Sequence, residues 1–246
     1  MGAGSMYYDE YGKENEKIIV MLHGANFVHS FGKQYQLADR YHIIVPHLMG
    51  YGNETDKIFN ADEQINELVG FISSLENKVA LVGFSLGAQI GFRLAAEHQE
   101  LFTCAIVVSP WLCKNKETTE QVLKENEKQF ALFKKKWLCS LIGLMNGLPK
   151  EQRKEFVEQM QKVSIDTVRN SVDNGITLES VSSFENLTIP VMALAGGKEQ
   201  DVVKNSVIKM SRLNKYCSYE IWDKAAHNIP AICAKQFNEL ICKIVG

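Results

Sequence analysis

A serine between two glycines is the first candidate for chemistry. Ser85 is the third residue of GFSLG (residues 83–87), directly after the apolar run 78–82 and at the start of the helical pattern 86–98. A strand, a tight turn and a helix in this order are the context of a nucleophile elbow, where side chains two residues before and after the serine would collide with the backbone. The sequence therefore predicts Ser85 as a nucleophile. The alternative is a glycine-rich turn whose serine only caps the helix.

A nucleophilic serine needs a base, and position separates the candidates among the six histidines. His227 lies in the loop after the apolar run 216–222. This places it at the carboxyl end of a predicted strand, where parallel sheets collect functional groups. His42 begins a predicted strand, at the opposite edge, and His98 ends a predicted helix. We therefore expect His227 to be the base.

The segment HGAN (residues 23–26) ends the apolar run 17–22 at the same edge of the predicted sheet. Its glycine lets the chain turn sharply, so that the next backbone N–H can point into the site. The N–H groups of Ala25 and Leu86 are expected to form a two-donor oxyanion hole. His23 is expected to position this loop by hydrogen bonds rather than to act as a second base.

Short apolar runs rich in β-branched residues alternate with helical patterns along the chain. The runs cover residues 17–22, 41–45, 78–82, 103–108, 189–195 and 216–222. Their continuous apolarity indicates strands that are buried on both faces of a parallel sheet. The helical patterns cover residues 62–75, 86–98, 202–213 and 231–244. The predicted fold class is α/β, with a mostly parallel, doubly wound sheet.

Residues 111–184 interrupt this alternation with helical segments and no convincing strand. The segments cover residues 118–133, 136–145 and 150–170. Their large apolar residues are too many for helices surrounded by solvent, so we expect them to pack on the main body or to line a cavity. Phe133 and Trp137 are expected to form the acyl side of a substrate pocket. The alternative is a helical subdomain with its own core. The main domain is then formed by residues 6–110 and 185–246.

Composition limits the classes of partner. Lys and Arg number 27 against 29 Asp and Glu, so there is no overall positive charge for a phosphate backbone or an anionic bilayer. No nucleic-acid or membrane partner is expected. The six cysteines are scattered without a CxxC pair, which indicates reduced thiols and no metal site. The N-terminus has no secretory pattern, so a cytoplasmic location is expected, and no cofactor is implied.

Five motifs, taken in order, resemble those of the α/β-hydrolase family. They are HGAN (23–26), VPHLMGYGNE (45–54), GFSLG (83–87), LAGGKEQDVV (194–203) and AAHNIP (225–230), within a resemblance over residues 7–245. In that family a nucleophile, an acid and a histidine follow one another along the chain, and a helical lid follows the sixth strand. The resemblance implies Ser85 as nucleophile, His227 as base, Ala25 and Leu86 as oxyanion donors, and residues 111–184 as the lid.

The acid departs from the pattern of the family, which has Asp three positions after a glycine. Gly196 places Glu199 at that offset, and Asp201 lies two residues further on. Glu199 fits by position and Asp201 by type. We expect Glu199 to be the acid and Asp201 to cap the helix that follows it. His47 is a second departure, at a place where the family usually has Asp, and is expected to change local hydrogen bonding rather than catalysis.

A serine in the nucleophile position differs from the epoxide hydrolases and dehalogenases of this family, which use a carboxylate. The resemblance implies a serine hydrolase that cleaves a small carboxylic ester or thioester, its small-molecule partner, through an acyl-enzyme on Ser85. Two other functions stay open. One is a lyase or carbon–carbon bond hydrolase that uses the same triad for proton abstraction, as the menaquinone-pathway lyases do. The other is a ligand-binding member without turnover.

Overall fold

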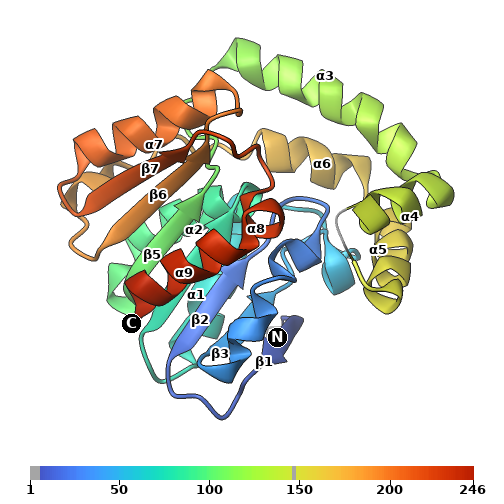
Figure 1. The fold of residues 1–246 in the computed structure, drawn as a ribbon. Helices are drawn as coiled ribbons and strands as arrows, with labels where there is room; N and C mark the ends of the chain where they lie inside the picture. Colours follow the sequence, from blue (N-terminus) through green and yellow to red (C-terminus); the bar gives the residue numbers. More distant parts are fainter. Residues whose placement is uncertain (1–5, 146–147) are drawn as a thin grey trace.

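The computed structural model describes residues 6–145 and 148–246. In these residues seven strands form one sheet in the order β1-β3-β2-β4-β5-β6-β7 (Figure 1). The strands are β1 (Tyr8–Tyr11), β2 (Ile18–Leu22), β3 (His42–Pro46), β4 (Val79–Phe84), β5 (Phe102–Val108), β6 (Val191–Gly196) and β7 (Cys217–Trp222). β1 pairs antiparallel with β3, and the other neighbouring strands pair in parallel. The predicted α/β fold class with a mostly parallel sheet is confirmed.

Both faces of the sheet are buried, which explains the continuous apolar runs. On β2, Ile19 and Met21 belong to one buried cluster, and Val20 and Leu22 belong to the other. Residues of α1 (Ala61–Ser73), α2 (Leu86–Glu97) and α7 (Asp201–Leu213) pack in the cluster of Val20, and residues of α9 (Ala234–Val245) pack in the cluster of Ile19. Helices on both sides thus leave the central strands no solvent face.

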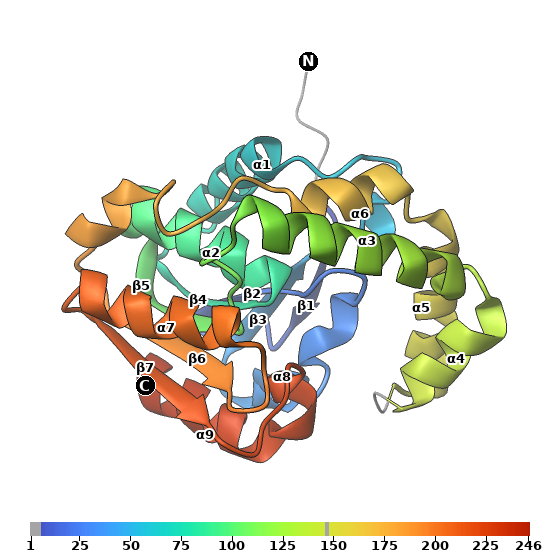
Figure 2. The ribbon, with the colours of Figure 1, turned by 90° about the horizontal axis from the view of Figure 1, so that it is seen from above.

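The remaining helices connect the strands or extend from them. They are α3 (Lys116–Phe133), α4 (Lys136–Met145), α5 (Lys150–Lys162), α6 (Ile165–Val172), α8 (Ile229–Ile232) and the 3₁₀ helices η1 (Val28–Phe31), η2 (Tyr35–Asp39), η3 (Gly52–Glu54), η4 (Gln99–Leu101) and η5 (Ser182–Asn186). Helices α3 to α6 lie between β5 and β6, within the predicted insertion 111–184, of which residues 146–147 lie outside the described residues. Figure 2 shows α3 and α6 side by side, with α4 and α5 at the margin of the molecule.

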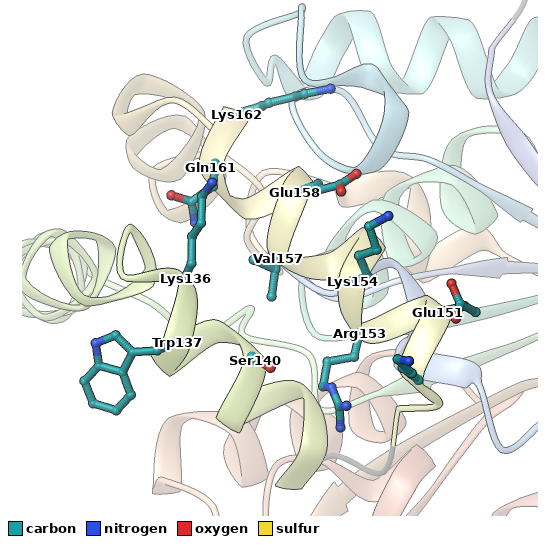
Figure 3. A pocket seen from close by; sticks show the side chains of 11 residues that line it. Lys136, Trp137, Ser140, Glu151, Arg153, Lys154, Val157, Glu158, Gln161 and Lys162 are labelled. Carbon is teal, nitrogen blue, oxygen red and sulfur yellow. The ribbon is translucent and has the colours of Figure 1, made fainter.

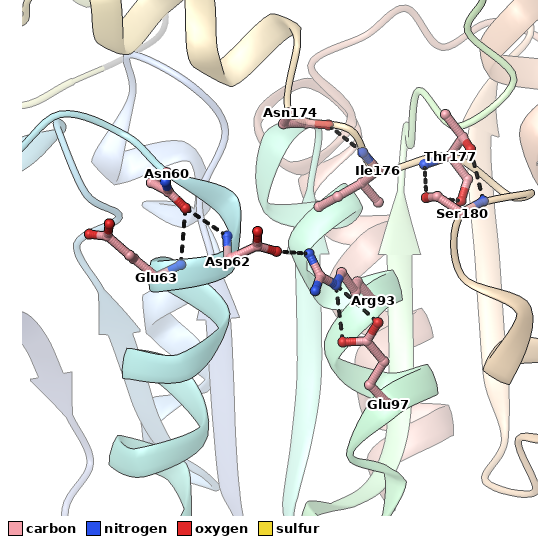
Figure 4. Close-up of polar contacts among 9 residues, drawn as sticks. All are labelled: Asn60, Asp62, Glu63, Arg93, Glu97, Asn174, Ile176, Thr177 and Ser180. Atoms are coloured by element: carbon pink, nitrogen blue, oxygen red, sulfur yellow. Dashed lines mark hydrogen bonds and ion pairs between the residues drawn. The ribbon is translucent and has the colours of Figure 1, made fainter.

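Polar contacts on the surface join α1 to α2, the helix that follows Ser85 (Figure 4). The Asn60 side chain caps α1 by accepting hydrogen bonds from the N–H groups of Asp62 (3.0 Å) and Glu63 (3.1 Å). Arg93 on α2 donates to the Asp62 carboxylate at 2.6 Å and to Glu97 at 3.0 Å. Exposed pairs of this kind contribute at most about 1 kcal/mol each, so the apolar clusters carry most of the stability.

Among the differences between predicted and observed elements, three concern β1, α6 and α7. The sequence patterns do not predict β1, because this four-residue edge strand has exposed and half-buried side chains rather than a buried run. The predicted helix 150–170 is two helices, because Ser164 caps α6 by accepting a hydrogen bond from the N–H of Thr167 (3.0 Å). Helix α7 begins at Asp201, one residue earlier than predicted.

Two groups can be distinguished among the large apolar residues of the insertion. Phe130, Phe133 and Ile142 pack against the buried core. The second group is exposed and consists of Leu132, Trp137, Leu141, Leu144 and Met145. The expectation was that these side chains pack on the main body or line a cavity, and the second group does not pack on the main body, although Trp137 borders a groove. Among the described residues, no helix combines the length and the apolarity needed to cross a membrane.

Two glycines let the backbones of β2, β4 and α2 touch. A Cβ at Gly87 would overlap the backbone carbonyl groups of Leu22 and His23, and one at Gly83 would overlap the carbonyl group of Gly87. Only a residue without a side chain permits such close contact. The serine between them is therefore fixed by contacts between backbones rather than by side-chain packing.

We expect Gly87→Ala to destabilise the fold, because the new methyl group would force α2 away from β2. Gly91→Ala is the matched control on the same helix, since its Cβ would meet the Leu81 side chain at an ordinary distance of 3.6 Å. Alanine also has a helix propensity about 1 kcal/mol better than glycine. Thermal denaturation should show a Tm lowered by about 5 °C or more for Gly87→Ala and an unchanged or raised Tm for Gly91→Ala. Equal melting temperatures would contradict this account.

Candidate active site

Ser85 occupies a strained turn between β4 and α2. Its backbone has a φ of 56° and a ψ of −112°, a region that residues with a side chain rarely adopt. The Ser85 N–H donates to the Val108 carbonyl at 2.9 Å, and the Ala88 N–H donates to the Ser85 carbonyl at 3.1 Å. These bonds hold the strained residue in place, as is typical of functional sites. The hydroxyl lies at the carboxyl edge of the sheet.

The structure brings Ser85, His227 and Glu199 together. His227 Nε2 lies 3.0 Å from Ser85 Oγ, and His227 Nδ1 lies 2.6 Å from Glu199 Oε1. An ionised carboxylate can only accept, so Nδ1 carries the proton and Nε2 is left to accept the hydroxyl hydrogen of Ser85. The imidazole is thereby oriented with its basic nitrogen toward the serine.

Glu199 is a buried carboxylate with several donors around it. Its second oxygen, Oε2, accepts hydrogen bonds from the Gly196 N–H at 2.7 Å and from the Ser109 hydroxyl at 2.8 Å. Burial raises the pKa of Glu199, but the bonds from His227, Gly196 and Ser109 outweigh burial and lower this pKa below its ordinary value. Glu199 is therefore ionised at neutral pH.

Asp201 does not reach His227. Its side chain is 88% exposed and pairs with Lys204 on the same helix at 2.9 Å. Gln200, not Asp201, occupies the N-cap position of α7, and the Gln200 side chain makes no capping hydrogen bond. The prediction that Asp201 caps this helix is wrong, because the helix begins at Asp201 itself.

His23 is a buried residue that holds two loops. Its Nδ1 lies 2.8 Å from the Gly24 carbonyl, and its Nε2 accepts a hydrogen bond from the Leu48 N–H at 3.0 Å. Burial lowers the pKa of His23 to about 3, so the ring is neutral with the proton on Nδ1. These contacts are those expected of a positioning residue.

Two backbone N–H groups beside Ser85 are free to bind a ligand. Ala25 and Leu86 line the same cavity as Ser85. Among residues 6–145 and 148–246, neither N–H has a hydrogen-bond acceptor. The Ala25 loop is shaped by Asn26, which has a φ of 64°, and by the Phe27 N–H, which donates to the Gly24 carbonyl at 3.3 Å. An oxyanion hole needs two such donors beside the nucleophile.

The cavity above Ser85 has a volume of about 600 Å³ and is covered by part of the insertion. Besides Trp111 at its start, the insertion lines the cavity with residues of α3 and α6 that mix apolar with polar side chains. They are Val122, Glu125, Asn126, Gln129, Val168, Ser171 and Val172. Gln89 and Lys198 of the main domain also contribute to the wall. A cavity of this size fits a small organic molecule.

Phe133 and Trp137 do not line this cavity, so their predicted role as its acyl side is wrong. Helix α3 has 18 residues and spans about 27 Å, and its cavity-lining residues end at Gln129. Phe133 lies one turn further on and packs against the core, while Trp137 on α4 borders a separate groove between α4 and α5.

Ser109 and Tyr51 are residues of this site that the sequence patterns did not single out. Ser109 follows β5 with a φ of 54° and holds Glu199 as described above. The Tyr51 hydroxyl lies 2.7 Å from Ser171 Oγ, which links the wall of the cavity to α6. The available signal for Ser109 was a serine directly after an apolar run at the functional edge.

His47 makes its polar contacts outside the cavity of Ser85. Its Nδ1 accepts a hydrogen bond from the Asn53 N–H at 2.9 Å, and its Nε2 lies 3.5 Å from the Asp9 carboxylate. His47 does not line the cavity of Ser85. Within the described residues, no group of three or more His, Cys, Asp or Glu side chains is placed to hold a metal ion.

Comparison with known proteins identifies the family of this chain. The family model for the alpha/beta hydrolase fold matches residues 17–229, which include all three residues of the hydrogen-bonded chain. The chain belongs to the α/β-hydrolase fold family. The expected family and the expectation of an α/β-hydrolase enzyme are therefore confirmed. A sequence relative, the uncharacterized hydrolase YugF of Bacillus subtilis, is 29% identical over 152 residues. These residues cover 58% of this chain, and the chain spans only about half (55%) of the length of that relative.

Solved structures share the fold at low sequence identity. A bromoperoxidase from Bacillus anthracis superposes with a TM-score of 0.79 at 17% identity, covering 98% of this chain and 95% of the other. An enol-lactonase from Burkholderia xenovorans LB400 has a TM-score of 0.76 at 12% identity, covering 98% and 96%. An esterase from Exiguobacterium antarcticum has a TM-score of 0.74 at 17% identity, covering 98% and 95%. These similarities establish the fold.

The lowered pKa of Glu199 predicts a pH-dependent contribution to stability. A carboxyl group whose pKa falls on folding stabilises the native state above its unfolded pKa, near 4.5, and loses this contribution as pH falls through the lower folded pKa. Urea unfolding at several pH values should therefore show a difference between wild type and Glu199→Gln that is largest at neutral pH and shrinks below about pH 4.5. A difference that is constant or grows on acidification would contradict the assignment.

Proposed function

We propose that this α/β-hydrolase is a serine hydrolase that cleaves small carboxylic esters or thioesters through an acyl-enzyme on Ser85. The observation that carries the proposal is the continuous chain from Ser85 Oγ through His227 to Glu199, with contacts of 3.0 and 2.6 Å. A nucleophile, an oriented base and a buried carboxylate form the arrangement that acyl transfer requires.

The proposed reaction has two halves. Ser85 Oγ attacks the carbonyl carbon while His227 Nε2 takes the hydroxyl proton, and the N–H groups of Ala25 and Leu86 stabilise the oxyanion that forms. His227 then returns the proton to the leaving alcohol or thiol. In the second half water attacks the acyl-enzyme, His227 takes a proton from the water, and Ser85 regains it as the carboxylic acid leaves. Glu199 keeps the imidazole oriented and stabilises its cationic form.

The lining of the cavity supports a small substrate rather than a long acyl chain. Val122, Val168 and Val172 offer apolar surface, but Asn126 and Gln129 interrupt it on α3. A long acyl chain would need a continuous apolar wall, since polar groups buried against it without partners cost free energy. The names of the esterase and the enol-lactonase with this fold are consistent with acyl chemistry.

Ser85→Ala should lower kcat on a short-chain p-nitrophenyl ester by about a thousandfold or more, because the nucleophile is lost. His227→Ala should have a similar effect, and the double variant should be no slower than the worse single variant, since the two residues act as one unit. Steady-state kinetics provide the test, with a fluorophosphonate probe that should label wild type on Ser85. A Ser85→Ala variant that retains a tenth of the activity would refute the proposal, as would an absence of turnover on every ester in a panel of acyl lengths.

Glu199→Gln and Asp201→Asn separate the two candidate acids. Glu199→Gln should lower kcat by several orders of magnitude, because Gln can present its amide N–H to His227 and reverse the required tautomer. Asp201→Asn should leave kcat within about twofold of wild type, since this side chain is exposed and pairs only with Lys204 among the described residues. Loss of activity in Asp201→Asn alone would move the acid to residue 201.

A further inference from the structure

Helix α4 is apolar on two opposite sides, and only one of them is covered. Cys139 and Gly143 are buried on one side. The opposite side exposes four large apolar residues, with Trp137 67% and Met145 78% exposed. The four are Trp137, Leu141, Leu144 and Met145. Their spacing of four, three and one residues puts them within one arc of about 100° on the helix. An amphipathic helix packed on a protein normally has one apolar face, and the second face of α4 is left uncovered by residues 6–145 and 148–246.

Positively charged side chains border this apolar face. A groove between α4 and α5 with a volume of about 740 Å³ is lined by Trp137 together with cations of both helices. The cations are Lys136, Lys150, Arg153, Lys154 and Lys162, and they outnumber the two carboxylates of the lining, Glu151 and Glu158. Figure 3 shows the Trp137 indole pointing away from α5, beside the groove. On the helical wheel Lys136 and Ser140 lie between the buried side of α4 and its exposed arc, so charge and apolar surface adjoin.

The charge of this region differs from that of the whole chain. Residues 134–162 contain seven Lys and Arg against three Glu, whereas the chain carries a net charge of −2. The exposed Lys135, Lys136, Lys150 and Lys154 form no ion pair within residues 6–145 and 148–246. Lys134 differs, because its ammonium donates to three backbone carbonyls at the end of α5, at 2.7 to 3.1 Å. The free cations are therefore available to an external anion.

We propose that the face formed by α4 and the basic start of α5 docks on an anionic lipid surface. Apolar side chains that flank a lysine cluster match the two layers of such a surface, since Trp and Leu enter the acyl boundary and the ammonium groups meet lipid phosphates. Helix α4 has 10 residues and a length of about 15 Å, so it lies in the interface and does not cross it. A second copy of the chain fits less well, because it would bring two clusters of like charge together.

This proposal revises the sequence-based expectation of no membrane partner. That expectation rested on the near-neutral net charge of the whole chain. A bilayer, however, responds to the charges close to it, because electrostatic attraction in salt acts over a Debye length of about 10 Å. Figure 2 places α4 and α5 at the margin of the molecule, where a planar surface can reach them.

Vesicle co-sedimentation of the full chain tests the proposal. Wild type should bind vesicles of phosphatidylcholine with phosphatidylglycerol, should bind pure phosphatidylcholine at least about tenfold more weakly, and should be released by salt. Lys150→Glu combined with Lys154→Glu should weaken binding to the anionic vesicles at least about tenfold, as should Trp137→Ser combined with Leu141→Ser. Thermal denaturation should show that both double variants stay folded, because all four side chains are exposed.

Two matched controls change exposed residues elsewhere. Lys209→Glu combined with Lys215→Glu makes the same change of charge in and after α7, and Ile232→Ser removes an apolar side chain that is 69% exposed on α8. Both should bind vesicles like wild type. As a second measurement, anionic vesicles should shift the tryptophan emission of wild type to the blue, and Trp137→Phe should abolish the shift.

Three outcomes would overturn the proposal. The first is that wild type binds neither vesicle type, or both equally. The second is that the control variants lose binding as much as the α4 and α5 variants do. The third is that sedimentation equilibrium shows a dimer of wild type that Trp137→Ser with Leu141→Ser dissociates, which would assign the face to a second copy. None of these outcomes bears on the proposed chemistry at Ser85, which the ester assays test separately.

Discussion

Direct contact between three backbones is the constraint on which the proposed site depends. Gly83 and Gly87 have no side chain, so the end of β4 and the start of α2 can touch the end of β2. The Gly87 N–H donates to the His23 carbonyl at 3.1 Å, and the His23 ring holds the loops at Gly24 and Leu48. One buried histidine thereby fixes the distance between the Ser85 turn and the Ala25 loop. Because of this contact, the N–H groups of Ala25 and Leu86, which have no acceptor in the described part of the chain, border the same cavity as Ser85.

A second constraint is a hydrogen bond from the residue that follows each of two strands to the neighbouring strand. The N–H of Ser85 after β4 donates to Val108 of β5, and the N–H of Ser109 after β5 donates to Leu194 of β6 at 2.7 Å. Both serines have a positive φ, of 56° and 54°. The chain thus turns in the same way at two adjacent strand ends, so that one serine faces His227 and the other faces Glu199. Burial of the Glu199 carboxylate is tolerated because Ser109, Gly196 and His227 together satisfy its oxygens.

The parts of the molecule that sequence could predict are those set by local pattern. The buried strands and Ser85 follow from apolar runs and from glycine spacing, and His227 and Glu199 follow from their places after predicted strands. The place of Ser109 after an apolar run marked it as a candidate, but its contact with Glu199 could not be predicted, because that contact depends on the pairing of β5 with β6. The break between α5 and α6 could not be predicted either, because residues 150–170 have one continuous helical pattern. The break depends on the side chain of Ser164, which caps α6. The direction in which α3 crosses the cavity depends on tertiary packing and cannot be derived from the helical pattern. The prediction that Phe133 and Trp137 line the cavity was wrong for this reason.

The insertion divides into two halves with different surroundings. Its first and last helices, α3 and α6, pack against each other and supply the cavity residues, with Tyr51 and Ser171 joining them to the main domain at 2.7 Å. Its middle helices, α4 and α5, pack on each other and leave apolar and basic side chains facing outward. An excess of apolar residues in an insertion therefore has two physical explanations, a covered cavity or an external surface, and periodicity cannot separate them, since both produce the same spacing on a helix. The charged residues beside the apolar ones distinguish the two explanations. Around the cavity of Ser85 they are few and of both signs, whereas in the groove beside Trp137 they are predominantly positive.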